Sequence, residues 1–259
     1  MVAIDDTFSQ YSRTVEYYGR YRPRYPQTLI EWLKAECAFT PLQVVADIGS
    51  GTGQMTELFV KHGNPVYAIE PNADMRAVAE RELDTYPRLT SLSATAEETT
   101  LPDHSVHLIT VGNAFHWFKH DQVQKEFRRI LIARGWVVLA WNLERNNGSP
   151  FASAFEEFWK KHIDPAARFE GFRARNHPDY IFQFFDGDHF KEKSLDNYQV
   201  CDFEALKGLA LSFLKAPQAD DPRHPAMLAE LKEIFDRNQI NGGVTLEYDT
   251  AIYYGQLLA

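Results

Sequence analysis

The sequence predicts an α/β protein with a three-layer, doubly wound sheet of seven strands, mostly parallel with an antiparallel edge strand, plus a helical cap. Short apolar runs alternate with helical patterns from about residue 42 to residue 142. A glycine-rich turn follows the first of these runs, and two more strand patterns occur late in the chain. Because parallel strands need crossover helices, the alternation predicts helices on both faces of a parallel sheet.

The first half of the chain supplies five strand patterns. The helix that precedes them spans 28–39, with apolar residues at helical spacing just after Pro26. The run "LQVVADI" (42–48) is typical of a buried parallel strand. The other predicted strands are 64–71, 89–94, 106–114 and 135–142. The helices between them begin at Gln54 and span 72–83, with Asn72 as the N-cap, and 121–131.

The second half of the chain has a different organisation. Helical patterns lie at about 151–163, 203–214 and 225–238, and strand patterns lie at 191–200 and 244–255. We expect the two strands to extend the sheet edge as a hairpin-like pair. The aromatic-rich segment 146–190 is then an insertion after the fifth strand. Its helical stripe of Phe151, Phe155, Phe158 and Trp159 is most simply explained as core.

Composition excludes several classes of protein. The chain has 259 residues, 44% of them hydrophobic, and a formal net charge of −9, which argues against a general nucleic-acid or membrane-surface binder. No apolar run approaches the ~20 residues that span a bilayer, and the first residues lack a secretory pattern. Cys37 and Cys201 have no Cys or His nearby at ligand spacing, so we expect no metal site and a reducing, cytoplasmic setting.

The turn "DIGSGTGQ" contains Gly49, Gly51 and Gly53. A dinucleotide fingerprint would have a third glycine at the sixth position, where this chain has Gln54. A phosphate-binding P-loop would have a lysine, and the turn has none. The alternative is a tight turn that binds nothing, but three glycines are costly unless the backbone must approach a ligand.

An acid ends the second predicted strand. Glu70 lies nineteen residues after Gly51, where doubly wound folds place an acid that binds ribose hydroxyls. The alternative is an exposed acid at a strand end. After the third strand, Ala96 and Glu97 could border an adenine. Together these features indicate a ligand that has a ribose but no pyrophosphate.

Four segments in order, "VADIGSGTG", "AIEPNADM", "SATAEETTLPDHSVHLITVGNAFHWF" and "GWVVLAWN", carry a family resemblance. They resemble the class I S-adenosylmethionine-dependent methyltransferases, which have a Rossmann-like fold, over about residues 42–142. Two further segments, "YGRYRPRYP" (18–26) and "NAFHWF" (113–118), narrow the resemblance. They are similar to the small-molecule branch of the family, also called methyltransferase type 11, which includes the trans-aconitate methyltransferase-like proteins.

The resemblance implies that the chain binds S-adenosyl-L-methionine and releases S-adenosyl-L-homocysteine. The glycines would wrap the methionine part, Glu70 would hold the ribose, and Met75 would lie on the adenine side. From the N-terminal segment, Tyr18 and Arg22 would reach the methionine end, although Arg22 suits a carboxylate substrate equally well. The implied cofactor-binding residues are Tyr18, Arg22, Asp47, Gly49, Ser50, Gly51, Gly53, Glu70, Pro71, Met75, Ala96, Glu97, Asn113 and Ala114.

The loop after the fourth strand supplies the catalytic candidates, because ligands of open α/β sheets lie at this end. His116 is the best proton acceptor there, and a base is needed only when the methyl acceptor is protonated. Phe115, His116 and Trp117 are the candidate substrate contacts. The alternatives are a structural role for His116 and plain core packing for at least one aromatic residue.

The predicted layout is a single methyltransferase domain, 1–259. Residues 1–40 form N-terminal cap helices, 41–145 the cofactor-binding core, 146–190 a cap insertion, and 191–259 the last strands and helices. The predicted function is methyl transfer to a small-molecule acceptor, without nucleic acid or membrane as a partner. The alternatives are a cofactor-binding sensor without transferase activity and a nicotinamide-dependent reductase, and Gln54 counts against the latter.

Overall fold

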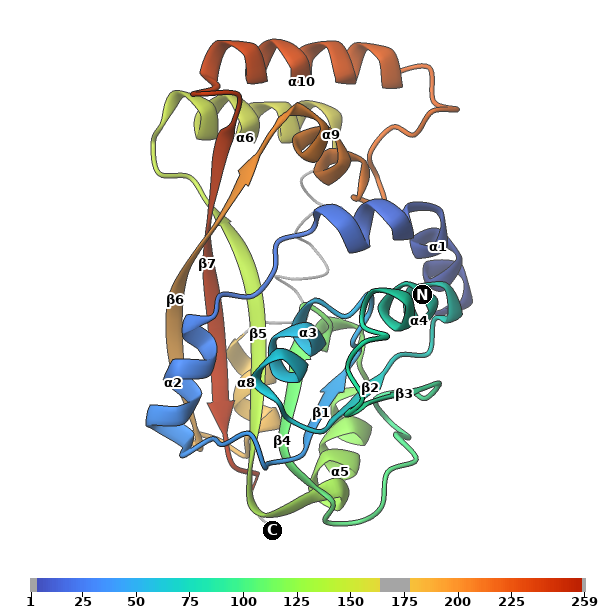
Figure 1. Ribbon diagram of the computed structural model, residues 1–259, viewed down its shortest axis with the longest axis vertical. Helices are drawn as coiled ribbons and strands as arrows, with labels where there is room; N and C mark the ends of the chain where they lie inside the picture. Colours follow the sequence, from blue (N-terminus) through green and yellow to red (C-terminus); the bar gives the residue numbers. More distant parts are fainter. Residues whose placement is uncertain (1–3, 164–177, 258–259) are drawn as a thin grey trace.

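The computed structural model describes residues 4–163 and 178–257, and its centre is a seven-stranded sheet (Figure 1). The strand order is β3-β2-β1-β4-β5-β7-β6, which confirms the predicted fold class. The strands are β1 Val45–Ile48, β2 Val66–Ile69, β3 Leu89–Leu92, β4 Val106–Gly112, β5 Leu131–Arg145, β6 Phe190–Cys201 and β7 Val244–Gly255.

The first five strands are parallel, and β7 is antiparallel to both of its neighbours, β5 and β6. The antiparallel strand therefore lies one place inside the edge, and β6 closes the sheet. The strands β6 and β7 pair from Phe190 to Cys201 as predicted, but two helices separate them in sequence, so they do not form a hairpin. The strand β5 is longer than the predicted 135–142 at both ends, because it starts at Leu131, directly after a helix, and continues its pairing with β7 to Arg145.

Helices cover both faces of the sheet. Asn72 caps its helix as predicted, since its side chain accepts hydrogen bonds from the backbone N–H groups of Asp74 and Met75. The described helices are α1 Ile4–Tyr21, α2 Thr28–Cys37, α3 Gln54–His62, α4 Ala73–Glu82, η1 Phe115–Trp117, α5 His120–Ile130, α6 Pro150–His162, α8 Pro178–Phe184, α9 Phe203–Leu211 and α10 His224–Asn238. None of these described helices is long and apolar enough to cross a membrane.

A helical cap lies beyond one end of the sheet, where α6, α9 and α10 gather next to α1 (Figure 1). The aromatic stripe from Phe151 to Trp159 on α6 is buried in this cap, as expected for core residues. The other end of the aromatic-rich segment lies elsewhere, because Ile181 and Phe184 of α8 pack on the face of the sheet that α5 covers. The described parts of the segment 146–190 therefore serve two different cores.

Candidate cofactor and active site

The glycine turn between β1 and α3 needs all three of its glycines. Gly49, Gly51 and Gly53 have φ values of +68°, +56° and +88°, in the left-handed region that favours glycine. A Cβ at Gly49 would lie 2.7 Å from the Cβ of Ala114, and one at Gly53 would lie 2.9 Å from Leu83 Cδ1. The turn is thus pressed against the loop after β4 on one side and against α4 on the other.

Glu70 is joined to this turn by hydrogen bonds. Its carboxylate accepts from the backbone N–H of Gly51 at 2.9 Å and from that of Asn72 at 2.8 Å. Burial raises the pKa of Glu70, and the two N–H groups oppose that rise. An ionised carboxylate offers about four acceptor positions, so this one keeps acceptor capacity for ribose hydroxyls. Pro71 follows it, and Met75 lies against Gly51, whose added Cβ would be 3.5 Å from Met75 Sδ.

Asp47 has no exposed surface and braces three elements. Its carboxylate accepts hydrogen bonds from the hydroxyls of Thr56 on α3, at 2.6 Å, and Thr110 on β4, at 3.1 Å. Burial raises the pKa of Asp47 to about 6, although both hydroxyls work against the rise. Ionisation of Asp47 next to the turn therefore lowers the stability of the folded protein.

Gln54, the residue at the sixth position of the turn, attaches the cap to the turn. Its side-chain amide donates to the carbonyl of Tyr18 at 3.2 Å and accepts from the Thr52 hydroxyl at 2.9 Å. Gly19 packs tightly there, because an added Cβ would lie 2.9 Å from Val78 Cγ1. The end of α1 thus lies directly on the turn and on α4. From the sequence, Gln54 was noted only because a dinucleotide fingerprint would have glycine at that position, and its contact with α1 was not predicted.

Arg22 points from the end of α1 toward the cap. Its guanidinium lies 3.7 Å from the ring centroid of Phe213 and 4.9 Å from that of Tyr18, and it donates to the carbonyl of Ser212 at 3.3 Å. None of these partners of Arg22 belongs to the glycine turn. The Nε of Arg22 is buried and has no hydrogen-bond partner among the described residues.

The segment that follows α1, residues 21–26, is named here the strap. Its backbone carbonyls accept hydrogen bonds from three side-chain amides of β5 and β6: Gln199 to Tyr21 O at 3.0 Å, Asn197 to Arg24 O at 2.8 Å, and Asn142 to Pro23 O and Arg24 O at 3.4 Å each. In Figure 1 the strap crosses in front of the sheet from α1 to α2. It is fixed over the carboxyl ends of the central strands.

The loop after β4 contributes Asn113 and Ala114. Asn113 has a φ of +53°, and its backbone N–H donates to the carbonyl of Ala140 on β5. Ala114 is the residue that faces Gly49. Asparagine tolerates the left-handed region better than most residues, so the chain turns sharply here toward the glycine turn.

The predicted adenine side is held against this loop. Ala96 is buried, and the Glu97 carboxylate accepts from the backbone N–H of Lys119 at 2.9 Å. Farther along, Glu126 of α5 accepts from the backbone N–H and the hydroxyl of Thr99 and pairs with Arg129. Sequence reasoning missed Glu126, although a carboxylate in line with the apolar stripe of α5 was a usable signal.

The three candidate substrate contacts on η1 have different surroundings. Phe115 is completely buried and stacks on His120 with ring centroids 4.4 Å apart, so it belongs to the core. Trp117 is 43% exposed, and His116 is partly exposed beside it, with ring centroids 4.8 Å apart. The structure thus leaves His116 and Trp117 accessible and does not bring Phe115 to the surface of the site.

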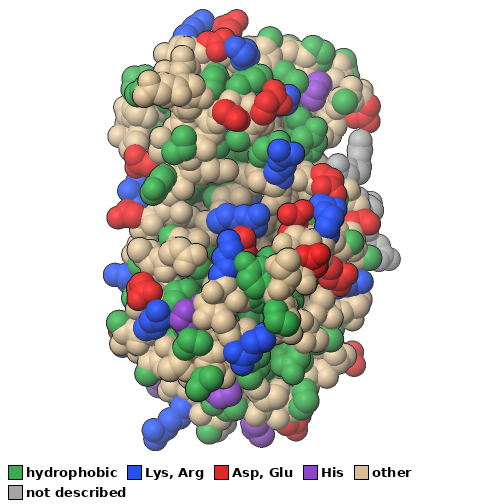
Figure 2. All heavy atoms as spheres, in the orientation of Figure 1, with side chains coloured by type: hydrophobic (Ala, Val, Ile, Leu, Met, Phe, Trp, Pro, Cys, Tyr) green, Lys and Arg blue, Asp and Glu red, His purple; other side chains and the backbone are tan. Residues whose placement is uncertain are grey.

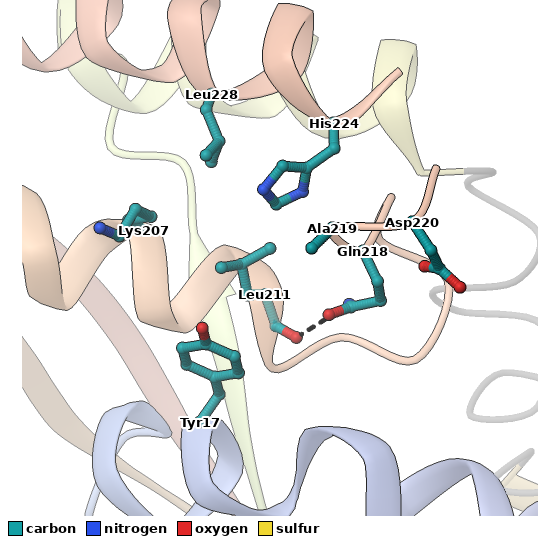
Figure 3. A pocket seen from close by; sticks show the side chains of 8 residues that line it. All are labelled: Tyr17, Lys207, Leu211, Gln218, Ala219, Asp220, His224 and Leu228. Atoms are coloured by element: carbon teal, nitrogen blue, oxygen red, sulfur yellow. Dashed lines mark hydrogen bonds between the residues drawn. The ribbon is translucent and has the colours of Figure 1, made fainter. Parts of the chain in front are cut away.

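A hollow of about 420 Å³ lies between α1, α9 and α10 (Figure 3). Figure 3 shows Tyr17, Leu211 and His224 around it, each from a different element. Tyr17 and Tyr21 lie one helical turn apart with stacked rings, whereas Gly19, between them, packs on Thr52. The hollow and the glycine turn therefore lie on opposite sides of α1. Charges of both signs are interspersed over the face shown in Figure 2.

Comparison with known sequences finds similarity to methyltransferases. Residues 46–139 match the family model described as a methyltransferase domain. An uncharacterized methyltransferase of Schizosaccharomyces pombe is 26% identical over 238 residues, which cover 91% of this chain and 92% of that protein. An uncharacterized methyltransferase of Mycobacterium bovis is 35% identical over 137 residues, 53% of this chain and 54% of that protein, so this match spans about half of either.

Solved structures share the fold. A protein of Anaeromyxobacter dehalogenans described as a type II methyltransferase has a TM-score of 0.65 at 23% identity, over 92% of this chain and 99% of that one. A protein of Anabaena variabilis, described as a methyltransferase from an antibiotic biosynthesis pathway, has a TM-score of 0.61 at 20% identity, over 92% and 99%. This chain therefore contains a stretch, residues 46–139, that matches a methyltransferase domain, and it shares the overall fold of these two solved structures.

Proposed function

We propose that the chain is an enzyme that uses S-adenosyl-L-methionine to methylate a small molecule and releases S-adenosyl-L-homocysteine. One observation supports this most: the Glu70 carboxylate is hydrogen-bonded to Gly51, inside a turn of three left-handed glycines. That arrangement suits a nucleoside whose ribose meets a carboxylate. The turn has neither the lysine nor the sixth glycine that bound phosphates require.

The residues present fit this cofactor. The glycines leave three positions of the turn without a side chain, which lets the backbone approach a ligand closely. Glu70 keeps acceptor positions for the ribose, and Met75 with Ala96 offers apolar surface for the adenine. The proposed binding residues remain the fourteen predicted from the sequence, with Asp47 acting through its buried charge and Arg22 through its Nε.

The chemistry asks little of the protein beyond alignment and exclusion of water. When bound, the cofactor supplies a methyl group that is already activated by a sulfonium. The end of α1 lies on the glycine turn and shields part of it from water. For a protonated acceptor, His116 takes up the proton, through Nε2 because its Nδ1 is buried. Trp117 offers an exposed aromatic wall for the acceptor.

The proposal includes a cytoplasmic location. Both cysteines, Cys37 and Cys201, are free thiols buried in the protein, and burial raises the pKa of each to about 12. Thiols kept unpaired and protonated are suited to a reducing compartment.

Titration calorimetry tests the cofactor. We expect S-adenosylmethionine and S-adenosylhomocysteine to bind and NADH not to bind. Failure of both adenosyl ligands to bind at sub-millimolar concentration would refute the proposal. A screen of small metabolites that detects formation of S-adenosylhomocysteine then tests transfer. Binding without turnover on any metabolite would favour a sensor over an enzyme.

A further inference from the structure

Tyr25 of the strap ends in a hydroxyl without a partner. The side chain is 7% exposed, and its hydroxyl has no hydrogen-bond partner among the described residues. The ring packs in the core on the α2 and α3 face of the sheet. A buried hydroxyl without a partner destabilises a folded protein, so phenylalanine would be the more stable residue for folding alone. The hydroxyl therefore calls for a functional explanation.

The hydroxyl lies at the carboxyl end of β4. Its oxygen would be 2.6 Å from a Cβ added at Gly112, the last residue of that strand, so the oxygen occupies the space that a side chain there would take. Asp47 is paired with Thr110 in the parallel register, so Gly112 is two residues beyond the level of Asp47. This is the end of the sheet where the glycine turn and Asn113 lie.

The charges around the hydroxyl select the kind of ligand group. Burial raises the pKa of Tyr25 well above its ordinary value, and the neighbouring Tyr18 and Asp47 raise it further, so the phenol is neutral at physiological pH. The Asp47 carboxylate repels an anion at this place and attracts a cation. Among the polar groups of the proposed cofactor, only the ammonium of its amino-acid part is both cationic and a hydrogen-bond donor.

We propose that the Tyr25 hydroxyl oxygen accepts a hydrogen bond from the ammonium group of the bound cofactor, close to the Asp47 carboxylate. This inference rests on the proposed function. It also complements Arg22, the other strap residue with a buried, unpartnered polar atom among the described residues: Arg22 Nε can donate only, which suits the carboxylate of the same amino-acid part. The strap thus offers the Tyr25 hydroxyl to the ammonium and Arg22 Nε to the carboxylate of the amino-acid part.

The test compares two ligands on the Tyr25→Phe variant. S-adenosylhomocysteine carries the amino-acid part, and 5′-methylthioadenosine has the same nucleoside without it. We expect Tyr25→Phe to lower the affinity for S-adenosylhomocysteine about ten- to a hundredfold, as for loss of a hydrogen bond to a charged group, and to leave the affinity for 5′-methylthioadenosine unchanged. The ligand-free variant should melt at or above the wild-type temperature.

Tyr254→Phe is the matched control. Tyr254 is buried in the same core, but its hydroxyl donates to Glu36 at 2.9 Å. This variant should lose stability and keep wild-type affinity for both ligands. Unchanged affinity of Tyr25→Phe for S-adenosylhomocysteine, or equal losses for both ligands, would overturn the inference. Wild-type protein that binds neither ligand would instead refute the proposed function.

Discussion

Replacement of Asp47 by asparagine should stabilise the protein at neutral pH. Asparagine is nearly isosteric, and its amide oxygen can still accept from Thr56 or Thr110, the two hydroxyls that hold the carboxylate. What it removes is a fully buried negative charge. The fold thus no longer bears the cost of ionising that group in its interior.

The magnitude follows from the pKa of Asp47, which rises from an ordinary value of 3.8 to about 6 in the folded protein. Because the folded pKa is the higher one, the native state binds the proton more tightly than the unfolded chain. The contribution of Asp47 to native stability is therefore greatest below pH 3.8, and it falls as pH rises until the loss is complete above about pH 6. By proton linkage the loss is about 1.5 kcal/mol at pH 5 and about 3 kcal/mol at pH 7.5.

Urea unfolding of both proteins at several pH values measures this effect. The stability difference between Asp47→Asn and the wild type should grow by roughly 1.5 kcal/mol between pH 5 and pH 7.5. Glu70 and the other titrating groups are common to both proteins, so they largely cancel in the difference. A difference that stays constant over this range would refute the reasoning. The stabilised variant should also bind S-adenosylhomocysteine more weakly, because the charge that attracts the ammonium is gone.

Three further predictions concern the cofactor, the stability of the fold and the methyl acceptor. Glu70→Ala should weaken binding of S-adenosylhomocysteine in calorimetry by roughly 1–3 kcal/mol, since it removes the ribose acceptor, and unchanged affinity would rule out the ribose role. Glu126→Ala should lower the free energy of unfolding in urea by about 1–3 kcal/mol, because the N–H and hydroxyl of Thr99 lose their acceptor. A variant as stable as the wild type would show that water replaces the carboxylate. His116→Ala should reduce turnover about a hundredfold or more on a protonated acceptor while cofactor affinity is kept, and normal turnover would assign His116 a structural role.

The sheet and the glycine turn were predictable because their signals are local. Apolar runs and helical stripes in the first half of the chain predicted the alternation of strands and helices. The left-handed glycines follow from the spacing within one short turn. The Asn72 cap was predictable for the same reason. Each of these features depends on residues only a few positions apart.

The orientation of individual site residues was not predictable in this way. Phe115 and Trp117 are two residues apart in one aromatic motif, yet one is buried and the other 43% exposed, because a single turn of η1 sends them to opposite environments. Arg22 stacks on Phe213, almost two hundred positions along the chain. Such contacts are set by how distant elements meet, and a local pattern carries no information about that.

The anchoring of the strap has a consequence for synthesis of the protein. Asn197 and Gln199 hold carbonyls that lie 173 and 178 positions earlier in the chain. A ribosome that adds about 5–20 residues per second makes these two amides roughly ten to forty seconds after it makes the strap. The glycine turn can form early in translation. The strap can accept hydrogen bonds from Asn197 and Gln199 only when β6 has emerged from the ribosome. The nascent chain therefore forms the glycine turn first and fixes the strap last.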